Sequence, residues 1–323
     1  MQLSVLIPSR NEEFLKNTIE DIIKHAEAET EIITVLDGAW AEPPISQHPM
    51  VNIIYVPEAI GQRAATTAAA KLARGKYLAK VDAHCTFDQG FDRKMIEGFE
   101  EMGDDNVMVP IMRNLHAFDW KCYQCGKRTY QDAKPEKCDD CGCTDNFKKK
   151  MVWQPRKGTW QMSYCFDKDP HFQYFKEYKN HPQYKKDEPT KFTETMSLQG
   201  SFFMMTKELY FSLYGDREKY GSWGNEGIEI AAKAWLSGRR VIVNHNTWYG
   251  HMFRTKKDFS FPYPQSGREV VKTKNRIKEE IWNKGFKEQI YPISWLVERF
   301  IPVPGWKEED LSILKDTEFK PTV

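Results

Sequence analysis

A short string near residue 80 combines two residue types that bind metal ions. The sequence 77–85 runs from an apolar stretch into Asp82 and His84, which are separated by one residue. Just past the end of a strand, a carboxylate and an imidazole at this spacing can be aimed at one point, and together they suit Mn²⁺ or a related divalent ion better than Ca²⁺. Such an ion bridges a diphosphate and neutralises the charge that develops on it as a leaving group. Taken alone the string is a weak signal, because Asp and His are also ordinary turn residues.

A second group of potential ligands consists of cysteines. Four of the seven cysteines form two CxxC pairs, and they are Cys122, Cys125, Cys138 and Cys141. Because the first residues lack the features of a signal peptide, this spacing predicts a structural Zn²⁺ held by four thiolates rather than disulfides. Cys143 is an alternative fourth ligand. Two roles for this segment stay open, a stapled loop that only stabilises the fold and a surface that recognises a partner.

Length and charge limit the class of protein. The chain has 323 residues, 40% of them hydrophobic, and 47 Lys and Arg balance 46 Asp and Glu to a net charge of +1. This composition is globular and excludes a strongly basic nucleic-acid binder at the level of the whole chain, although not a local basic surface. No apolar run is long enough to predict a membrane span. We expect a soluble, cytoplasmic protein, and the sequence gives no indication of its oligomeric state.

The elements that must position these ligands alternate along the chain. We expect strands at 3–8, 31–37, 51–56, 76–81 and 106–111, and helices at 12–26, 61–74 and 91–102. Strands joined by helices predict an α/β fold with a mostly parallel sheet flanked by helices. The ligand crevice of such a sheet lies beyond the carboxyl ends of its strands, where Asp37 and Asp82 stand.

The pattern changes in the middle of the chain. Residues 113–195 hold the cysteines and many aromatic residues and show few strand patterns. Beyond them we expect strands at 196–206 and 240–243, helices at 207–214 and 226–237, and a basic helix near 268–283, followed by a proline-containing tail.

Several strings in this order resemble a known family. They are the sequence 7–12, Asp37, the Asp82–His84 pair, and the segments 223–229 and 250–254. The chain resembles GT-A glycosyltransferases of the family-2-like group, and especially polypeptide N-acetylgalactosaminyltransferases, which carry Asp-x-His, Trp-Gly-Gly-Glu-Asn-x-Glu and Gly-His-x-Phe-Arg strings. The resemblance covers about 1–110 and 196–255. It departs at Asn225, at Gly227 and at Gln199, where the family has Gly, Asn and Gly.

The resemblance implies a GT-A fold, which is Rossmann-like, here with an inserted four-cysteine zinc ribbon. It also implies that Asp82, His84 and His251 bind Mn²⁺ or Mg²⁺, and that the donor is a UDP-sugar. The implied donor-site residues are Ser9, Arg10 and Glu12 at the nucleoside, Asp37 at the nucleobase, Arg63 at the phosphates or the sugar, Arg254 as a further cation at the phosphates, and Gly200 at the sugar. Trp223 and Glu226 are implied on a loop that closes over the donor, with Glu226 as the candidate catalytic carboxylate. Whether the enzyme retains or inverts the anomeric configuration stays open.

Simpler interpretations of the same residues stand beside these. Asp37 can merely cap a turn, and Glu226 and Glu229 can be the solvated first turn of a helix, where acidic residues are favoured. His245 competes with His251 as third metal ligand, although we favour a structural role for His245.

The resemblance suggests a division of the chain into four parts. They are a nucleotide-sugar-binding half at 1–112, a zinc-ribbon and aromatic-rich insertion at 113–195, an acceptor and metal half at 196–255, and a basic helical extension at 256–323.

The acceptor is the least defined part of this hypothesis. Lys and Arg outnumber Asp and Glu in 119–160 and 254–278, and aromatic residues are interleaved with them. Basic charge with stacking surfaces suits a nucleic-acid backbone and extruded bases, so the hypothesis is a glycosyltransferase acting on a hydroxymethylated base in DNA. One alternative is the same chemistry on a protein, glycan or small molecule. Another is a catalytically silent GT-A fold that serves as a nucleic-acid-binding module.

Overall fold

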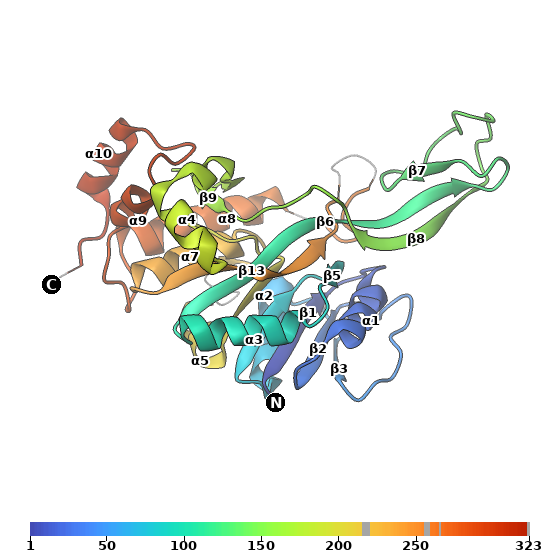
Figure 1. Cartoon of the computed structure of the whole chain (residues 1–323), viewed down its shortest axis with the longest axis horizontal. Coiled ribbons are helices and arrows are strands. Elements are labelled where there is room, and N and C mark those ends of the chain that lie inside the picture. Colours follow the sequence, from blue (N-terminus) through green and yellow to red (C-terminus); the bar gives the residue numbers. More distant parts are fainter. Residues whose placement is uncertain (215–219, 255–258, 265, 322–323) are drawn as a thin grey trace.

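The computed structural model describes residues 1–214, 220–254, 259–264 and 266–321, and a large mixed sheet is its centre (Figure 1). The main path of this sheet has the order β11-β13-β6-β12-β4-β1-β2-β3, with β5, β7 and β8 joined to its strands. Strands are β1 (Leu3–Ser9), β2 (Thr30–Asp37), β3 (Val51–Val56), β4 (Tyr77–Val81), β5 (Cys85–Phe87), β6 (Asn106–Cys122), β7 (Arg128–Tyr130), β8 (Phe147–Pro155), β11 (Phe192–Glu194), β12 (Phe202–Thr206) and β13 (Arg240–His251), and β9 (Tyr164–Phe166) and β10 (Phe172–Tyr174) form a separate pair.

The pairing confirms the predicted α/β class. Strands β4, β1, β2 and β3 are mutually parallel, and β6 is parallel to β13. Only β12, between β4 and β6, and β11, at the edge beside β13, run antiparallel on the main path. The carboxyl ends of β1, β2, β4, β6 and β13 therefore lie at the same edge of the sheet, which is where a GT-A fold places its ligands.

Helices cover both faces of the sheet, so its central strands are buried and mostly apolar. On one face lie α1 (Leu15–His25) and α3 (Phe91–Met102), whose apolar side chains form one core with the sheet. On the other lie α2 (Gln62–Leu72), α5 (Lys207–Leu213), α7 (Glu226–Leu236) and α9 (Ile293–Phe300), with a second core. The remaining helical segments are η1 (Lys176–Asn180), α4 (Pro182–Asp187), η2 (Glu188–Thr190), α8 (Gly267–Ile277), the π-helical turn η3 (Lys278–Asn283) and α10 (Glu308–Thr317).

A long hairpin projects from this body (Figure 1). β6 pairs with β13 as far as Asn114 and then continues to Cys122, paired with β8 and β7. The strand predicted at 106–111 is therefore too short. Polar residues in the part of β6 that enters the hairpin hide the alternation of apolar and polar side chains that predicts a strand. The strand predicted at 240–243 is also too short, since β13 runs to His251 through an irregularity between Asn244 and Trp248.

Three further elements begin or end at other residues than the sequence predicts. α1 begins at Leu15 instead of residue 12, so Glu12 is outside the helix. β12 begins at Phe202 instead of 196, and α2 ends at Leu72, before Gly75. The tail contains α9 and α10, which the sequence analysis did not predict. Among the described residues, every helix is too short or too polar to cross a lipid bilayer.

Candidate active site

Two strand ends bring the three predicted metal ligands together. Asp82 directly follows β4, His84 directly precedes β5, and His251 is the last residue of β13. One ligand atom from each lies within 4.8 Å of the others. Asp82 Oδ2 is 3.2 Å from His251 Nε2, and the two imidazole rings are 4.9 Å apart. The segments that carry these residues are more than 160 positions apart in sequence, and they meet because β4 and β13 end at the same edge of the sheet.

Burial and neighbouring charges give these residues the protonation states that a metal ion needs. Burial lowers the pKa of His251 to about 4, so its imidazole is neutral near pH 7. Burial raises the pKa of Asp82, but Lys80 and His251 outweigh this and hold the pKa below its usual value. A neutral imidazole and an ionised carboxylate are the ligand forms. The buried Nδ1 atom of His251 has no hydrogen-bond partner among the described residues, and a metal ion can satisfy an atom of this kind.

A cavity of about 350 Å³ adjoins these ligands. Its lining includes predicted donor-site residues from distant parts of the chain, namely Ser9, Arg10, Glu12, Asp37, Trp223 and Arg254, together with the three candidate metal ligands. The volume is within the range of small-molecule sites. The lining also contains Phe261 and Tyr263, which follow β13 and which the sequence analysis did not assign to the donor site.

Asp37 has backbone partners at the start of α2. Its carboxylate accepts hydrogen bonds from the amides of Ile60, at 2.6 Å, and Gly61, at 3.0 Å. The capping interpretation is therefore correct for these contacts. The same buried side chain lines the cavity, so a turn contact and a place in the cavity do not exclude each other.

Glu12 connects the first and last strings of the resemblance. Arg254 Nη2 donates to Glu12 Oε2 at 2.6 Å, and His84 Nδ1 lies 3.5 Å from the same oxygen. Burial raises the pKa of Glu12, but His84 and Arg254 outweigh it and lower the pKa. An ionised Glu12 beside His84 holds the imidazole in place, which is the usual second-sphere support of a metal ligand.

A second cavity of about 310 Å³ shares Asp82 and Trp223 with the first. It is lined by Gly200 and Glu226, and Glu226 Oε1 accepts a hydrogen bond from the Tyr214 hydroxyl at 2.8 Å. Glu226 is 5% exposed and Glu229 is fully buried, so the interpretation of these acids as a solvated first helical turn is wrong.

Arg63 lies apart from both cavities. Its guanidinium is fully buried, donates to Glu229 at 2.6 Å and to the Gly224 carbonyl at 3.0 Å, and is absent from the lining of either cavity. The expectation that Arg63 reaches the donor phosphates is therefore not supported by its position. Instead, Arg63 joins α2 to α7 and holds the loop that carries Trp223.

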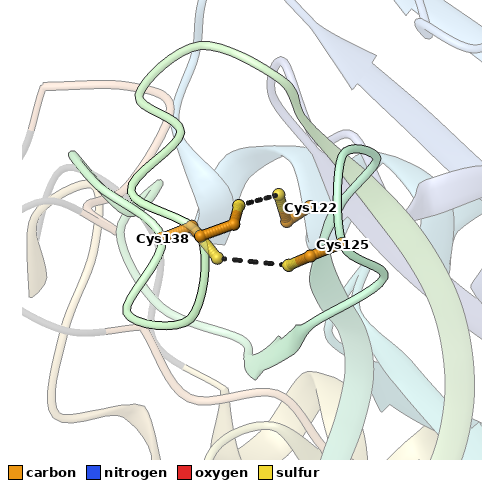
Figure 2. Close-up of side chains that lie close together, drawn as sticks. Cys122, Cys125 and Cys138 are labelled. Carbon is orange, nitrogen blue, oxygen red and sulfur yellow. Dashed lines mark hydrogen bonds between the residues drawn. The ribbon is translucent and has the colours of Figure 1, made fainter.

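The cysteines of the hairpin form a compact cluster (Figure 2). The sulfurs of Cys122 and Cys141 are 3.7 Å apart, and those of Cys125 and Cys138 are 3.6 Å apart. Tetrahedral Zn–S bonds of about 2.3 Å separate sulfurs by about 3.8 Å, so these four thiols fit a zinc ion. Cys143 is outside the cluster, and its sulfur faces Asp145.

Two other residues clarify the predictions. His245 is not the third ligand, because its imidazole is 2.8 Å from the Thr193 hydroxyl and it is not part of the metal cluster.

Lys80, which the sequence analysis passed over, donates to Asp82 Oδ1 from the same strand. A lysine two residues before Asp82 in an otherwise apolar strand shares its face of the sheet, and this signal was available in the sequence.

Comparison with known proteins identifies relatives of this arrangement. The family described as "Glycosyl transferase family 2" matches residues 4–211. Polypeptide N-acetylgalactosaminyltransferase 3 of Taeniopygia guttata is 25% identical over 249 residues, which are 76% of this chain and 35% of the relative. Its namesake in Homo sapiens is 24% identical over 301 residues, 89% of this chain and 42% of the relative.

A solved structure supports the fold. A crystal structure described as GalNAc-T7 with UDP, GalNAc and Mn2+ superposes with a TM-score of 0.62 at 18% identity, over 98% of this chain and 54% of the other. This likeness confirms the GT-A fold. The chain spans well under half the length of the curated relatives it matches.

Proposed function

Because the chain belongs to glycosyl transferase family 2, we propose that it moves a sugar from a nucleotide-sugar, with UDP as the nucleotide, to an acceptor hydroxyl. The observation that carries the proposal is the convergence of Asp82, His84 and His251 beside a cavity whose lining includes Asp37. A carboxylate and two imidazoles suit Mn²⁺ or Mg²⁺, with Mn²⁺ favoured by the nitrogen ligands.

We assign the residues as follows. Asp82, His84 and His251 hold the ion, which when bound neutralises the diphosphate leaving group. Asp37, Ser9 and Arg10 line the nucleoside part of the cavity, and Arg254 adds a positive charge for the phosphates.

Trp223 lines both cavities, so closure of its loop excludes water from the sugar and limits hydrolysis. Glu226 and Gly200 line the second cavity, which we assign to the sugar and the acceptor hydroxyl. Lys80 Nζ lies 3.7 Å from Glu226 Oε2, and we assign this carboxyl group to orienting a hydroxyl or accepting its proton.

The test is donor turnover with a panel of UDP-sugars, beginning with UDP-N-acetylgalactosamine because the curated relatives are named for that sugar. We expect release of UDP that depends on Mn²⁺ and is lost in D82N and H84A. The control H245Q changes a histidine outside the cluster and keeps activity. Full activity of D82N would falsify the metal assignment, and absence of turnover with every donor would favour the silent binding module.

The hairpin surface suggests the acceptor. Tyr123 is 52% exposed at its tip, with Lys121 Nζ 5.2 Å and Lys148 Nζ 5.6 Å from its ring. Neither lysine forms a salt bridge with another described residue, so both charges are free for an anionic partner. Other interleaved aromatics are not available in this way, since Phe147 is buried and the indole of Trp153 donates to Asp21 of α1.

A third cation, Arg113, lies at the base of the hairpin. The guanidinium of Arg113 is stacked between Trp160, 3.8 Å from its ring centroid, and Trp248, at 4.6 Å. It too has no salt bridge to a described residue. Aromatic-stacked cations of this kind suit the phosphates and bases of nucleic acid, so we propose DNA carrying a hydroxymethylated base as acceptor.

Two measurements test the acceptor. Hydroxymethylated and unmodified oligonucleotides are incubated with protein, Mn²⁺ and the donor that is turned over, and a sugar-sized mass gain is expected on the modified strand only. Binding of the same DNA is expected to weaken with salt and in the variant K121E/K148E, whereas D105K, on the opposite end of β6, serves as a control. A mass gain on protein, glycan or small-molecule acceptors instead would refute the DNA proposal and retain the enzyme class.

The zinc cluster and the domain ranges are part of this proposal. We propose a structural Zn²⁺ on Cys122, Cys125, Cys138 and Cys141, and we keep 1–112, 113–195, 196–255 and 256–323 as the proposed division of the chain. Measurement of zinc in the purified protein tests the first, with about one ion per chain expected.

A further inference from the structure

Lys80 is a buried cation in the centre of the sheet. Its side chain is 1% exposed, in β4 between strands β1 and β12. Its Nζ donates to Asp82 Oδ1 and to the Gly200 carbonyl, at 2.7 Å, and lies 3.7 Å from Glu226 Oε2. A lysine is almost never fully buried unless it is paired, so these oxygens are what make its position possible.

The contact divides the two oxygens of Asp82 between different partners. Oδ1 accepts from Lys80, while Oδ2 faces His251 Nε2 at 3.2 Å. Rotation of the carboxylate would break the bond to Lys80. Asp82 is therefore held with Oδ2 toward the imidazoles, which presents one oxygen to an ion.

We propose that Lys80 is a positioning residue that holds Asp82 with Oδ2 toward the imidazoles and that its own charge opposes an ion bound there. The proposal rests on the proposed function, since it concerns the same metal site. Lys80 orders the ligand but weakens the affinity for the ion, and its contact with Glu226 ties the metal carboxylate to the second cavity.

The charges of the cluster lead to an unusual expectation. Lys80 is the cation that lies between the carboxyl groups of Asp82 and Glu226 in the metal-free protein. If Lys80 is replaced by a neutral residue, the divalent ion becomes the compensating charge. The ammonium of Lys80 and a divalent cation repel each other, and this repulsion is stronger in a partly buried site than in water. Removal of the ammonium should therefore tighten binding of the ion.

The test compares K80M and K80Q with the wild type by calorimetric titration with Mn²⁺, alone and with UDP. We expect the dissociation constant for Mn²⁺ to fall at least about tenfold in both variants. We also expect Mn²⁺ to raise their melting temperature more than that of the wild type, while kcat with the best donor decreases. Affinity and turnover thus change in opposite senses, which a merely structural lysine does not produce.

K233M is the matched control because Lys233 is also a buried lysine paired with a glutamate. Its Nζ donates to Glu229 and to the Leu213 carbonyl and does not contact the candidate metal ligands. Its replacement should leave the Mn²⁺ dissociation constant within about twofold. Equal tightening in K233M would show a nonspecific effect and would overturn the proposal.

The outcomes separate the two proposals. If the wild type binds Mn²⁺ and neither Lys80 variant binds it more tightly, the role of Lys80 is wrong and the proposed function stands. If only the variants bind, the role of Lys80 stands and the metal-dependent function fails. If no protein binds Mn²⁺, both fail. If K80M and K80Q do not fold even with saturating Mn²⁺, the ion cannot replace the charge of Lys80 and the proposal is again overturned.

Discussion

Replacement of Arg63 distinguishes a donor contact from a structural clamp. Its guanidinium and the Glu229 carboxylate are fully buried and 2.6 Å apart, and a second nitrogen holds the Gly224 carbonyl. The aromatic rings of Tyr214 and Tyr220 lie 5.5 and 5.6 Å from the guanidinium carbon. Arg63→Met should therefore destabilise the protein rather than simply weaken donor binding.

The magnitude follows from what the substitution leaves behind. Among the described residues, Lys233 is then the cation that still pairs with Glu229, at 2.6 Å, so part of the buried charge of Glu229 loses compensation. Removal of one partner from a buried ion pair costs about 3–5 kcal/mol of unfolding free energy. In R63M/E229Q the carboxylate charge is gone as well, so the double variant should lose about 2 kcal/mol less than the sum of the single losses.

Urea unfolding of R63M, E229Q and the double variant measures this coupling. The control is R93M, because Arg93 is 47% exposed and ion pairs on the surface contribute little to stability. Donor KM is measured on the same proteins. A stable R63M with a strongly raised KM for UDP-sugar would refute the clamp and restore the phosphate contact that the resemblance implies.

Three further predictions concern pH, zinc and backbone packing. Burial lowers the pKa of His245 from 6.5 to about 4, so the unfolded chain binds a proton more readily than the folded protein does. The free energy of unfolding should therefore fall as the pH drops from 6.5 towards 4, by up to about 3 kcal/mol. Urea midpoints at pH 7 and pH 4.5 should show a smaller loss of stability in H245Q than in the wild type. Cys138→Ser should reduce bound zinc, measured by mass spectrometry, and make the hairpin tip sensitive to protease while the main body stays intact, and unchanged zinc content would contradict the site. A Cβ on Gly227 would lie 2.0 Å from the Leu198 carbonyl oxygen, so G227A should cost about 1–3 kcal/mol in thermal unfolding, whereas G267A, with open space around it, should change stability by less than about 1 kcal/mol.

The sequence predicts best where one physical signal dominates. The apolar run of β3 and the helical period of α3 give their bounds correctly, at Val51–Val56 and Phe91–Met102. Asp82, His84 and His251 come together as the family resemblance implied, whereas residue types and spacing alone indicated only Asp82 and His84.

What the sequence does not predict depends on contacts between distant segments. The sequence around Arg63 does not indicate whether its guanidinium faces a donor phosphate or Glu229. The packing of α2 against α7 brings Arg63 to Glu229. Lys80 looks like an isolated charge in a strand until Glu226 is brought beside it. The length of β6 is likewise set by pairing with β8, whose lysines at 148–150 break the apolar alternation.

The continuity of β6 limits what the zinc cluster can do. Asn114 pairs with His251 in the sheet, and the same strand ends at Cys122 in the cluster. At about 3.3 Å per residue, the eight intervening steps place the zinc site about 26 Å along the strand from the candidate metal centre. A zinc ion there is too far away to touch the reacting sugar, so its effect on transfer must pass through the hairpin.

Because the strand is hydrogen-bonded on the sheet side up to His251, an acceptor bound along the hairpin is held at a fixed distance from the donor. Shortening the hairpin while keeping the sheet should therefore reduce transfer to a long acceptor and leave hydrolysis of the donor unchanged, and loss of both together would show that the hairpin serves the fold alone.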